Sequence, residues 1–214
     1  MKKKLVIYIG IGIVVAAALA MYFLFIAPAD WQHGVSSAAT GVDADGNPWI
    51  GAKNPKLIIH EFLDYECPHC SAAHKYIRSR IARDFDTIRL VRHDYARSRC
   101  VMQLGTKKIK RCPLVRAAAC AAEHLPYWEW NDAVISNPRH ETQMEREEYI
   151  EYMRKQFDLP KAEFYECYES DETAEKAQKI YDLTRAAKVS VTPTYMIDGK
   201  IYNAQELADF LSNR

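Results

Sequence analysis

The sequence has no excess of charge of the kind that marks a nucleic-acid-binding protein. Its 214 residues include 29 lysines and arginines and 28 aspartates and glutamates. Residues 1–29 contain three of the lysines and no acid, so the remainder has 26 basic and 28 acidic side chains and a formal charge of −2. Proteins that bind DNA or RNA need a basic surface to neutralise phosphates. We therefore expect no nucleic acid among the partners.

Charged residues are also missing from the stretch between residues 5 and 26, which follows Lys2-Lys3-Lys4. As a helix, this stretch would rise about 33 Å, close to the thickness of a bilayer's hydrocarbon core. The apolar region of a signal peptide is shorter, about 7–15 residues. Residues 1–29 are therefore predicted to be an uncleaved transmembrane anchor, with a signal cleaved near Ala27-Pro28-Ala29 as the alternative. The lysines should stay in the cytoplasm, which predicts that the rest of the chain is exported.

The chain lacks a second Cys-x-x-Cys motif, which argues against a zinc site. Cys67-Pro68-His69-Cys70 is the single such motif among six cysteines. A structural zinc ion needs two further ligands at compatible spacing, and His69 or His74 would have to bend back from the same helix. We expect no metal and no cofactor. An even number of cysteines in an exported chain instead predicts disulfides, and a purely structural disulfide within the motif is the alternative to a reactive one.

The pattern of apolar residues predicts an α/β fold with an inserted helical subdomain. A strand, a helix and a strand in residues 51–97 form a βαβ unit. Residues 98–189 show four or five helices and no convincing strand. A hairpin with an Asp198-Gly199 turn and a closing helix complete the chain. The expected segments are an anchor or signal (1–29), a tether and leading strand (30–50), the βαβ half (51–97), an all-helical insertion (98–189) and a ββα half (190–214).

The position of Cys67 predicts thiol–disulfide chemistry. A cysteine that begins a helix lies where unpaired N–H groups and the helix dipole favour a thiolate. Pro68 suits the first helical position, and His69 adds a donor and partial positive charge near the sulfurs. Cys67 is therefore the expected nucleophile, and Cys70, one turn further along, is the expected resolving cysteine. Stabilising the thiolate form makes the disulfide more oxidising.

The segment EFLDYECPHC, residues 61–70, resembles the active site of DsbA-like proteins, the disulfide-introducing branch of the thioredoxin superfamily. The resemblance extends over about residues 50–214 and implies a thioredoxin fold, a mixed sheet flanked by helices. It also implies a cis peptide between Thr192 and Pro193 that faces the cysteines and binds client backbone. Glu61 matches a buried acid that helps to move protons. An unpaired buried carboxylate should have a raised pKa; the alternative is a solvated Glu61 at a strand edge.

The remaining four cysteines allow three pairings. Some DsbA-like proteins carry cysteines in places similar to Cys120 and Cys167, joined as a structural disulfide. Cys100 and Cys112 would then pair across a basic loop that contains Lys107, Lys108, Lys110 and Arg111. We favour these two disulfides. Cys120 could instead be a small buried residue, and Cys100 with Cys112 could form a second redox pair. We expect the basic loop to be solvated.

These features favour a thiol:disulfide oxidoreductase that introduces disulfides into exported proteins through Cys67 and Cys70. Its clients would be unfolded or folding proteins with free thiols, and a DsbB-like or VKOR-like membrane protein would reoxidise it. We expect a membrane-anchored monomer. One alternative is a reductase or isomerase kept reduced by a membrane donor. Another is a redox-inert peptide-binding chaperone, for which an intact Cys-x-x-Cys motif is hard to explain.

Overall fold

The computed structural model describes residues 38–213 of the chain. The predicted anchor (1–29) and most of the tether lie outside the described residues. Within residues 38–213, no helix combines the length and apolar character that crossing a bilayer requires.

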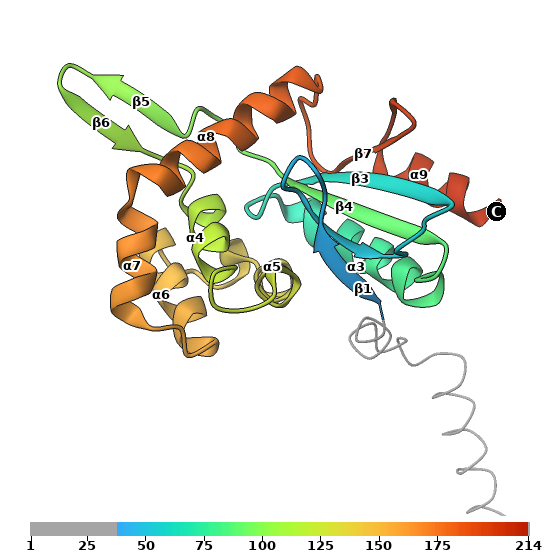
Figure 1. Ribbon diagram of the computed structural model, residues 1–214, viewed down its shortest axis with the longest axis horizontal. Coiled ribbons are helices and arrows are strands. Elements are labelled where there is room, and N and C mark those ends of the chain that lie inside the picture. Colours follow the sequence, from blue (N-terminus) through green and yellow to red (C-terminus); the bar gives the residue numbers. More distant parts are fainter. Residues whose placement is uncertain (1–37, 214) are drawn as a thin grey trace, which may run out of the picture.

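A six-stranded mixed sheet forms the centre of one of two lobes (Figure 1). β3 pairs in parallel with β4 and antiparallel with β7, which places the first strand of the βαβ unit beside the C-terminal hairpin. This confirms the predicted mixed sheet. Its strands, in spatial order, are β1 (Ala39–Val42), β2 (Pro48–Gly51), β4 (Ile88–Asp94), β3 (Leu57–Leu63), β7 (Thr194–Ile197) and β8 (Lys200–Tyr202).

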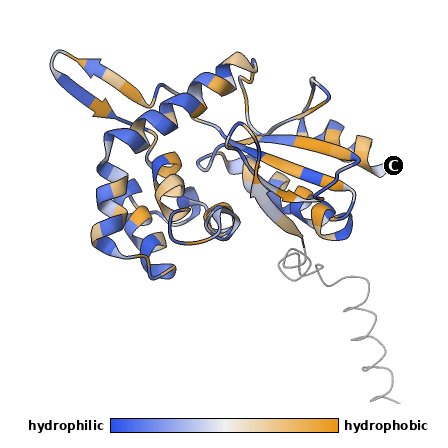
Figure 2. Ribbon diagram, in the orientation of Figure 1, coloured by the Kyte–Doolittle hydropathy of each residue, from blue (hydrophilic) through white to orange (hydrophobic). Residues whose placement is uncertain are grey.

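Two helices cover one face of this sheet. α3 (Pro68–Arg83) and α9 (Ala204–Ser212) contribute Ile77, Ile81 and Leu207 to a core that includes the fully buried Ile59 of β3. The hydropathy colouring shows the same concentration of apolar residues along the central strands (Figure 2). On the opposite face, Phe62 packs with Val189. Successive residues of a strand point to opposite faces, so β3 contributes to both cores.

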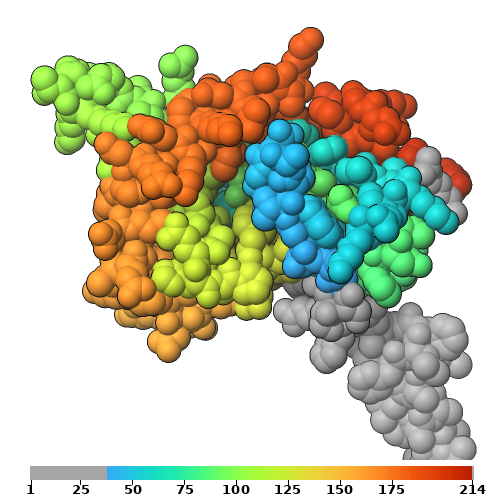
Figure 3. Space-filling view, viewed as in Figure 1, coloured from blue at the N-terminus to red at the C-terminus, as the bar shows by residue number. Residues whose placement is uncertain are grey.

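The insertion forms a second lobe with its own core, which meets the first along a seam (Figure 3). Trp130 and Phe164 are among its most buried residues, and the cluster also contains Cys67 and Cys70. The Cys67–Cys70 motif therefore lies where the two lobes meet. The helices are α4 (Pro113–Ala121), α5 (Tyr127–Ser136), the short 3-10 helix η2 (Arg139–Glu141), α6 (Arg146–Gln156), α7 (Lys161–Glu169) and α8 (Asp171–Ala186).

The prediction of an all-helical insertion is wrong at one place. β5 (Val101–Leu104) and β6 (Lys107–Lys110) form a hairpin that projects from the lobe (Figure 1). Its turn contains Gly105 at a positive φ of 60°. An isolated two-stranded hairpin is marginal in water. A disulfide holds the base of this hairpin, and ion pairs join one of its strands to α8. Because these contacts rather than apolar packing hold the hairpin, the apolar pattern of the sequence did not predict it.

Candidate active site

The Cys67 thiol lies at the N-terminus of α3. Cys67 is the N-cap residue, Pro68 takes the first helical position, and the first turn contains no acid. Helix geometry leaves N–H groups unpaired at this end. Cys67 is 7% exposed and Cys70 1% exposed, and both are free thiols, whereas Pro68 and His69 between them are exposed to solvent. The structure thus places the motif at a strand-to-helix junction, as expected from the sequence.

The backbone before Pro193 lies against Cys67. The peptide between Thr192 and Pro193 is cis, and the Cys67 Sγ donates a hydrogen bond to the carbonyl oxygen of Thr192 at 3.3 Å. Thr192 and Cys67 are 125 residues apart in sequence. The structure therefore brings together the two segments that the resemblance had paired, and it leaves the adjacent Val191 67% exposed.

Arginines neutralise both acids that precede the motif. Asp64 is hydrogen-bonded and ion-paired with Arg97. Glu66 accepts from Arg146 at 2.9 Å and from Arg139 at 3.1 Å. The hydrogen bond and ion pair with Asp64 raise the pKa of Arg97, so a charged guanidinium lies beside the acids that precede Cys67. The surroundings of Cys67 are suited to holding negative charge.

Glu61 is buried, but the expectation of a raised pKa is wrong. Burial alone would raise the pKa of this carboxyl group, which is inaccessible to solvent. His74 at 3.1 Å and Arg92 at 3.2 Å outweigh burial and lower the pKa. The hydroxyl of Tyr195 donates to the same carboxylate at 3.4 Å. Glu61 is therefore a paired, ionised acid, and the alternative of a solvated strand edge is also wrong.

Sequence reasoning missed the residues that pair with Glu61. His74 also contacts Asp132 of α5, with 2.9 Å between its Nε2 and the nearer carboxylate oxygen. Burial lowers the pKa of His74, but Glu61 and Asp132 raise it above its ordinary value. Because Asp132 is 15% exposed, the chain Glu61–His74–Asp132 leads from the buried acid to the surface of the insertion. His74 follows Cys70 by four residues, and this spacing could have revealed it, because it puts both on one helix face.

Cys70 lies next to this network. Burial raises the pKa of the Cys70 thiol, which favours its protonated form. Burial, then Glu61, raises the pKa of Tyr195, whose hydroxyl donates to the same carboxylate. Among residues 38–213, no three Cys, His, Asp or Glu side chains lie together as metal ligands.

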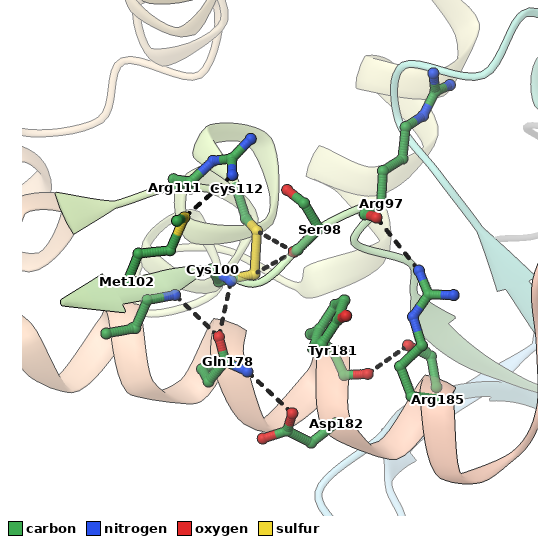
Figure 4. Close-up of a disulfide and its surroundings, with 12 residues drawn as sticks. Arg97, Ser98, Cys100, Met102, Arg111, Cys112, Gln178, Tyr181, Asp182 and Arg185 are labelled. Atoms are coloured by element: carbon green, nitrogen blue, oxygen red, sulfur yellow. Dashed lines mark hydrogen bonds between the residues drawn. A yellow bond between two sulfur atoms is a disulfide. The ribbon is translucent and has the colours of Figure 1, made fainter. Parts of the chain in front are cut away.

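The other four cysteines lie in two disulfides within the insertion. Cys120 of α4 is bonded to Cys167 of α7, and Cys100 is bonded to Cys112, here called the hairpin disulfide. The hairpin disulfide closes the base of β5–β6, with the carbonyl oxygen of Ser98 near both sulfurs (Figure 4). The structure thus has the pairing favoured from the sequence, with Cys120 in the same buried cluster as Cys67 and Cys70.

Three comparisons relate the chain to known proteins. The family model described as thioredoxin matches residues 43–212. The chain is 25% identical over 218 residues to the Na(+)/H(+) antiporter NhaA 3 of Salinispora tropica. That alignment covers 94% of this chain and 31% of the antiporter, so the chain spans less than a third of this relative's length.

Two solved structures share the fold. BdbD from Bacillus subtilis superposes with a TM-score of 0.59 at 19% identity, covering 82% of this chain and 97% of BdbD. The thiol-disulfide exchange protein α-DsbA2 from Wolbachia pipientis gives a TM-score of 0.56 at 19% identity, covering 86% of this chain and 91% of α-DsbA2.

Proposed function

We propose that this chain, which belongs to the thioredoxin family, introduces disulfides into other proteins through Cys67 and Cys70. Its fold is that of thioredoxin-like oxidoreductases and matches DsbA-type thiol-disulfide exchange proteins. The observation that carries the proposal is the different state of its cysteines. The four in the insertion are bonded in pairs, whereas Cys67 and Cys70 are free at the N-terminus of α3.

The reaction begins with the Cys67–Cys70 disulfide. A client thiolate attacks the Sγ of Cys67, the S–S bond breaks, and Cys70 leaves as a thiolate that takes up a proton. A second client thiolate then attacks the client sulfur of the mixed disulfide and releases Cys67 as a thiolate. Two electrons pass from the client to the enzyme, which ends as the dithiol. The client backbone would bind at Thr192 and Pro193, whose segment lies against Cys67.

The position of Cys67 supports the oxidising direction. Cys67 lies at the N-terminus of α3, where unpaired N–H groups and the helix dipole stabilise negative charge, and a stabilised thiolate makes the corresponding disulfide a stronger oxidant. We further propose that Glu61, hydrogen-bonded to His74 and Tyr195 beneath the motif, helps to move the proton that Cys70 takes up. Pro68 and His69 are the exposed residues of the motif, and His69 would face the client.

The proposal includes a site of action outside the cytoplasm. Stable disulfides persist in oxidising compartments, and the chain has two outside its redox motif. The apolar stretch of residues 5–26 would anchor the chain in the bacterial inner membrane with the described residues in the periplasm. A membrane oxidant of DsbB-like or VKOR-like type would regenerate the Cys67–Cys70 disulfide.

The redox potential of the motif tests this proposal. The full chain, kept in solution with a mild detergent, is equilibrated with mixtures of reduced and oxidised glutathione. Free thiols are then alkylated and counted by intact mass, with Cys67→Ala and Cys70→Ala as controls that remove the couple. DsbA-type proteins have potentials near about −120 mV and thioredoxin near about −270 mV.

A potential above about −150 mV supports a disulfide donor, on the same scale. A value near that of thioredoxin contradicts the oxidising direction and favours a reductase or isomerase. A motif that exchanges no thiols at any glutathione ratio rules out both and leaves the peptide-binding chaperone.

A further inference from the structure

A cleft with a volume of about 390 Å³ opens beside the redox motif. Glu66, the residue before Cys67, lines it together with Tyr95 and Arg97, which follow β4. Its other walls come from the insertion, namely the end of the hairpin, the start of α4 and the start of α6. An extended polypeptide advances about 3.3 Å per residue. A client bonded to Cys67 would therefore reach this cleft within a few residues of its cysteine.

The cleft carries more positive than negative charge when the side chains already joined in ion pairs are counted as neutral. Two of its three acids, Asp64 and Glu66, are already paired with arginines, and only Glu147 lacks a salt bridge among the described residues. Lys110 is paired with Asp171, which lies outside the cleft. The remaining cations, Arg111 and Arg116, have no carboxylate partner among the described residues. Figure 4 shows Arg111 and Arg97 on the side of the hairpin disulfide away from α8.

Arg116 gives a second, independent sign of a ligand. Its side chain is 5% exposed. It donates from Nη1 to the carbonyl oxygen of Tyr168 at 2.9 Å, and its guanidinium lies 4.1 Å from the centre of the Tyr168 ring. Its Nε is buried and has no hydrogen-bond partner within residues 38–213. An unpaired buried donor is costly, and a guanidinium binds a carboxylate with particular strength.

We propose that this cleft selects clients that carry an aspartate or glutamate a few residues from the cysteine that bonds Cys67. The acidic side chain enters the cleft and pairs with Arg111 at its exposed wall or with Arg116 at its buried wall. This inference rests on the proposed function, because it names the client class of that same site. It assigns the inserted helices and the base of the hairpin a part in client choice.

The test uses three peptides with two cysteines each, which differ at one position three residues from the first cysteine. That position is Asp, Ser or Lys. The oxidised full chain in mild detergent is mixed with each peptide, and kcat/KM for peptide oxidation is measured by the loss of free thiols. Binding of the same peptides with their cysteines alkylated is measured separately by fluorescence anisotropy.

Arg111→Glu reverses a charge in the cleft, and Lys107→Glu is its matched control. Both residues are exposed and lie on or beside β6. Lys107 is not part of the cleft. Four residues of strand separate them by about 13 Å, beyond the screening length of about 8 Å at physiological ionic strength.

We expect the parent chain to oxidise the Asp peptide about fivefold faster than the Lys peptide, the scale of one partly exposed ion pair. Arg111→Glu should abolish or invert this ratio, and Lys107→Glu should keep it. Equal rates for the three peptides, or the same loss of preference in both variants, would overturn the inference.

Failure of the proposed function gives a different result. If no peptide is oxidised, the function is wrong, and the cleft is then judged by anisotropy alone. Tighter binding of the alkylated Asp peptide, lost in Arg111→Glu but not in Lys107→Glu, would support it. Equal binding of the three peptides would overturn it.

Discussion

Replacing Glu61 with alanine would leave two cations inside the protein without their shared anion. Glu61 and Arg92 are both inaccessible to solvent, and His74 is 1% exposed. Each cation keeps another acid, because Arg92 contacts Asp94 at 2.9 Å and His74 contacts Asp132 at 2.9 Å. After the substitution, Arg92 and His74 would each be paired with one acid instead of two.

Breaking a buried ion pair by removing one partner costs about 3–5 kcal/mol. Because Arg92 and His74 each keep another acid, the cost of Glu61→Ala should lie at the low end of this range, at about 3 kcal/mol. The slope of unfolding free energy against urea is about 1–3 kcal/mol per molar for small proteins. The midpoint of urea unfolding should therefore fall by about 1–3 M.

Equilibrium unfolding of the full chain in mild detergent, followed by tryptophan fluorescence, measures this shift. Glu66→Ala is the matched control, because Glu66 also pairs with two arginines but is 24% exposed. Pairs with this exposure contribute about 0–1 kcal/mol. If Glu61→Ala costs no more than Glu66→Ala, the described pairing of Glu61 does not stabilise the fold and the reasoning fails.

Two further predictions concern pH and the disulfides. The folded-state pKa of Glu61 is lowered from 4.5 and that of His74 is raised from 6.5. The contribution of this pair to the free energy of unfolding should therefore be complete between pH 4.5 and pH 6.5. It should be lost as pH falls through the folded pKa of Glu61 or rises through that of His74. Urea unfolding of the parent chain and His74→Leu from pH 3 to 9 measures the difference, and a difference independent of pH would contradict the pairing. Replacing both Cys120 and Cys167 with alanine should cost about 4 kcal/mol, and removing the hairpin disulfide about 3, because their sequence separations are 47 and 12. The same unfolding measurement checks this order, and the reverse order would refute the loop-length argument.

Local signals made the redox motif predictable. Pro68 at the first helical position and a short apolar run before Cys67 are both readable from neighbouring residues, and they place the cysteine at a helix start. The central strands β3, β4 and β7 were predictable for the same reason, since each is a short segment rich in apolar residues and ended by turn residues. Before them one leading strand was expected, and the structure has two, β1 and β2.

The charge state of Glu61 was not predictable, because its partners are distant in sequence. Arg92 lies opposite Glu61 only through the parallel register of β3 and β4, 31 residues away. Asp132 enters the network through His74, from a helix whose packing against α3 no local pattern specifies. When only the neighbouring sequence is considered, Glu61 has no visible partner, so its pKa was expected to rise, whereas it falls.

The inserted helices act on the redox motif from two directions. Below Cys70, Asp132 of α5 supplies the solvent-facing end of the Glu61–His74 chain. Beside Cys67, α4 and α6 build the cleft, and Arg146 of α6 shares in neutralising Glu66. The core of the insertion also encloses both cysteines of the motif. The βαβ and ββα halves alone would therefore retain the two thiols but lose the solvent-facing end of the Glu61–His74 chain, part of the neutralising charge and the apolar cover of Cys70.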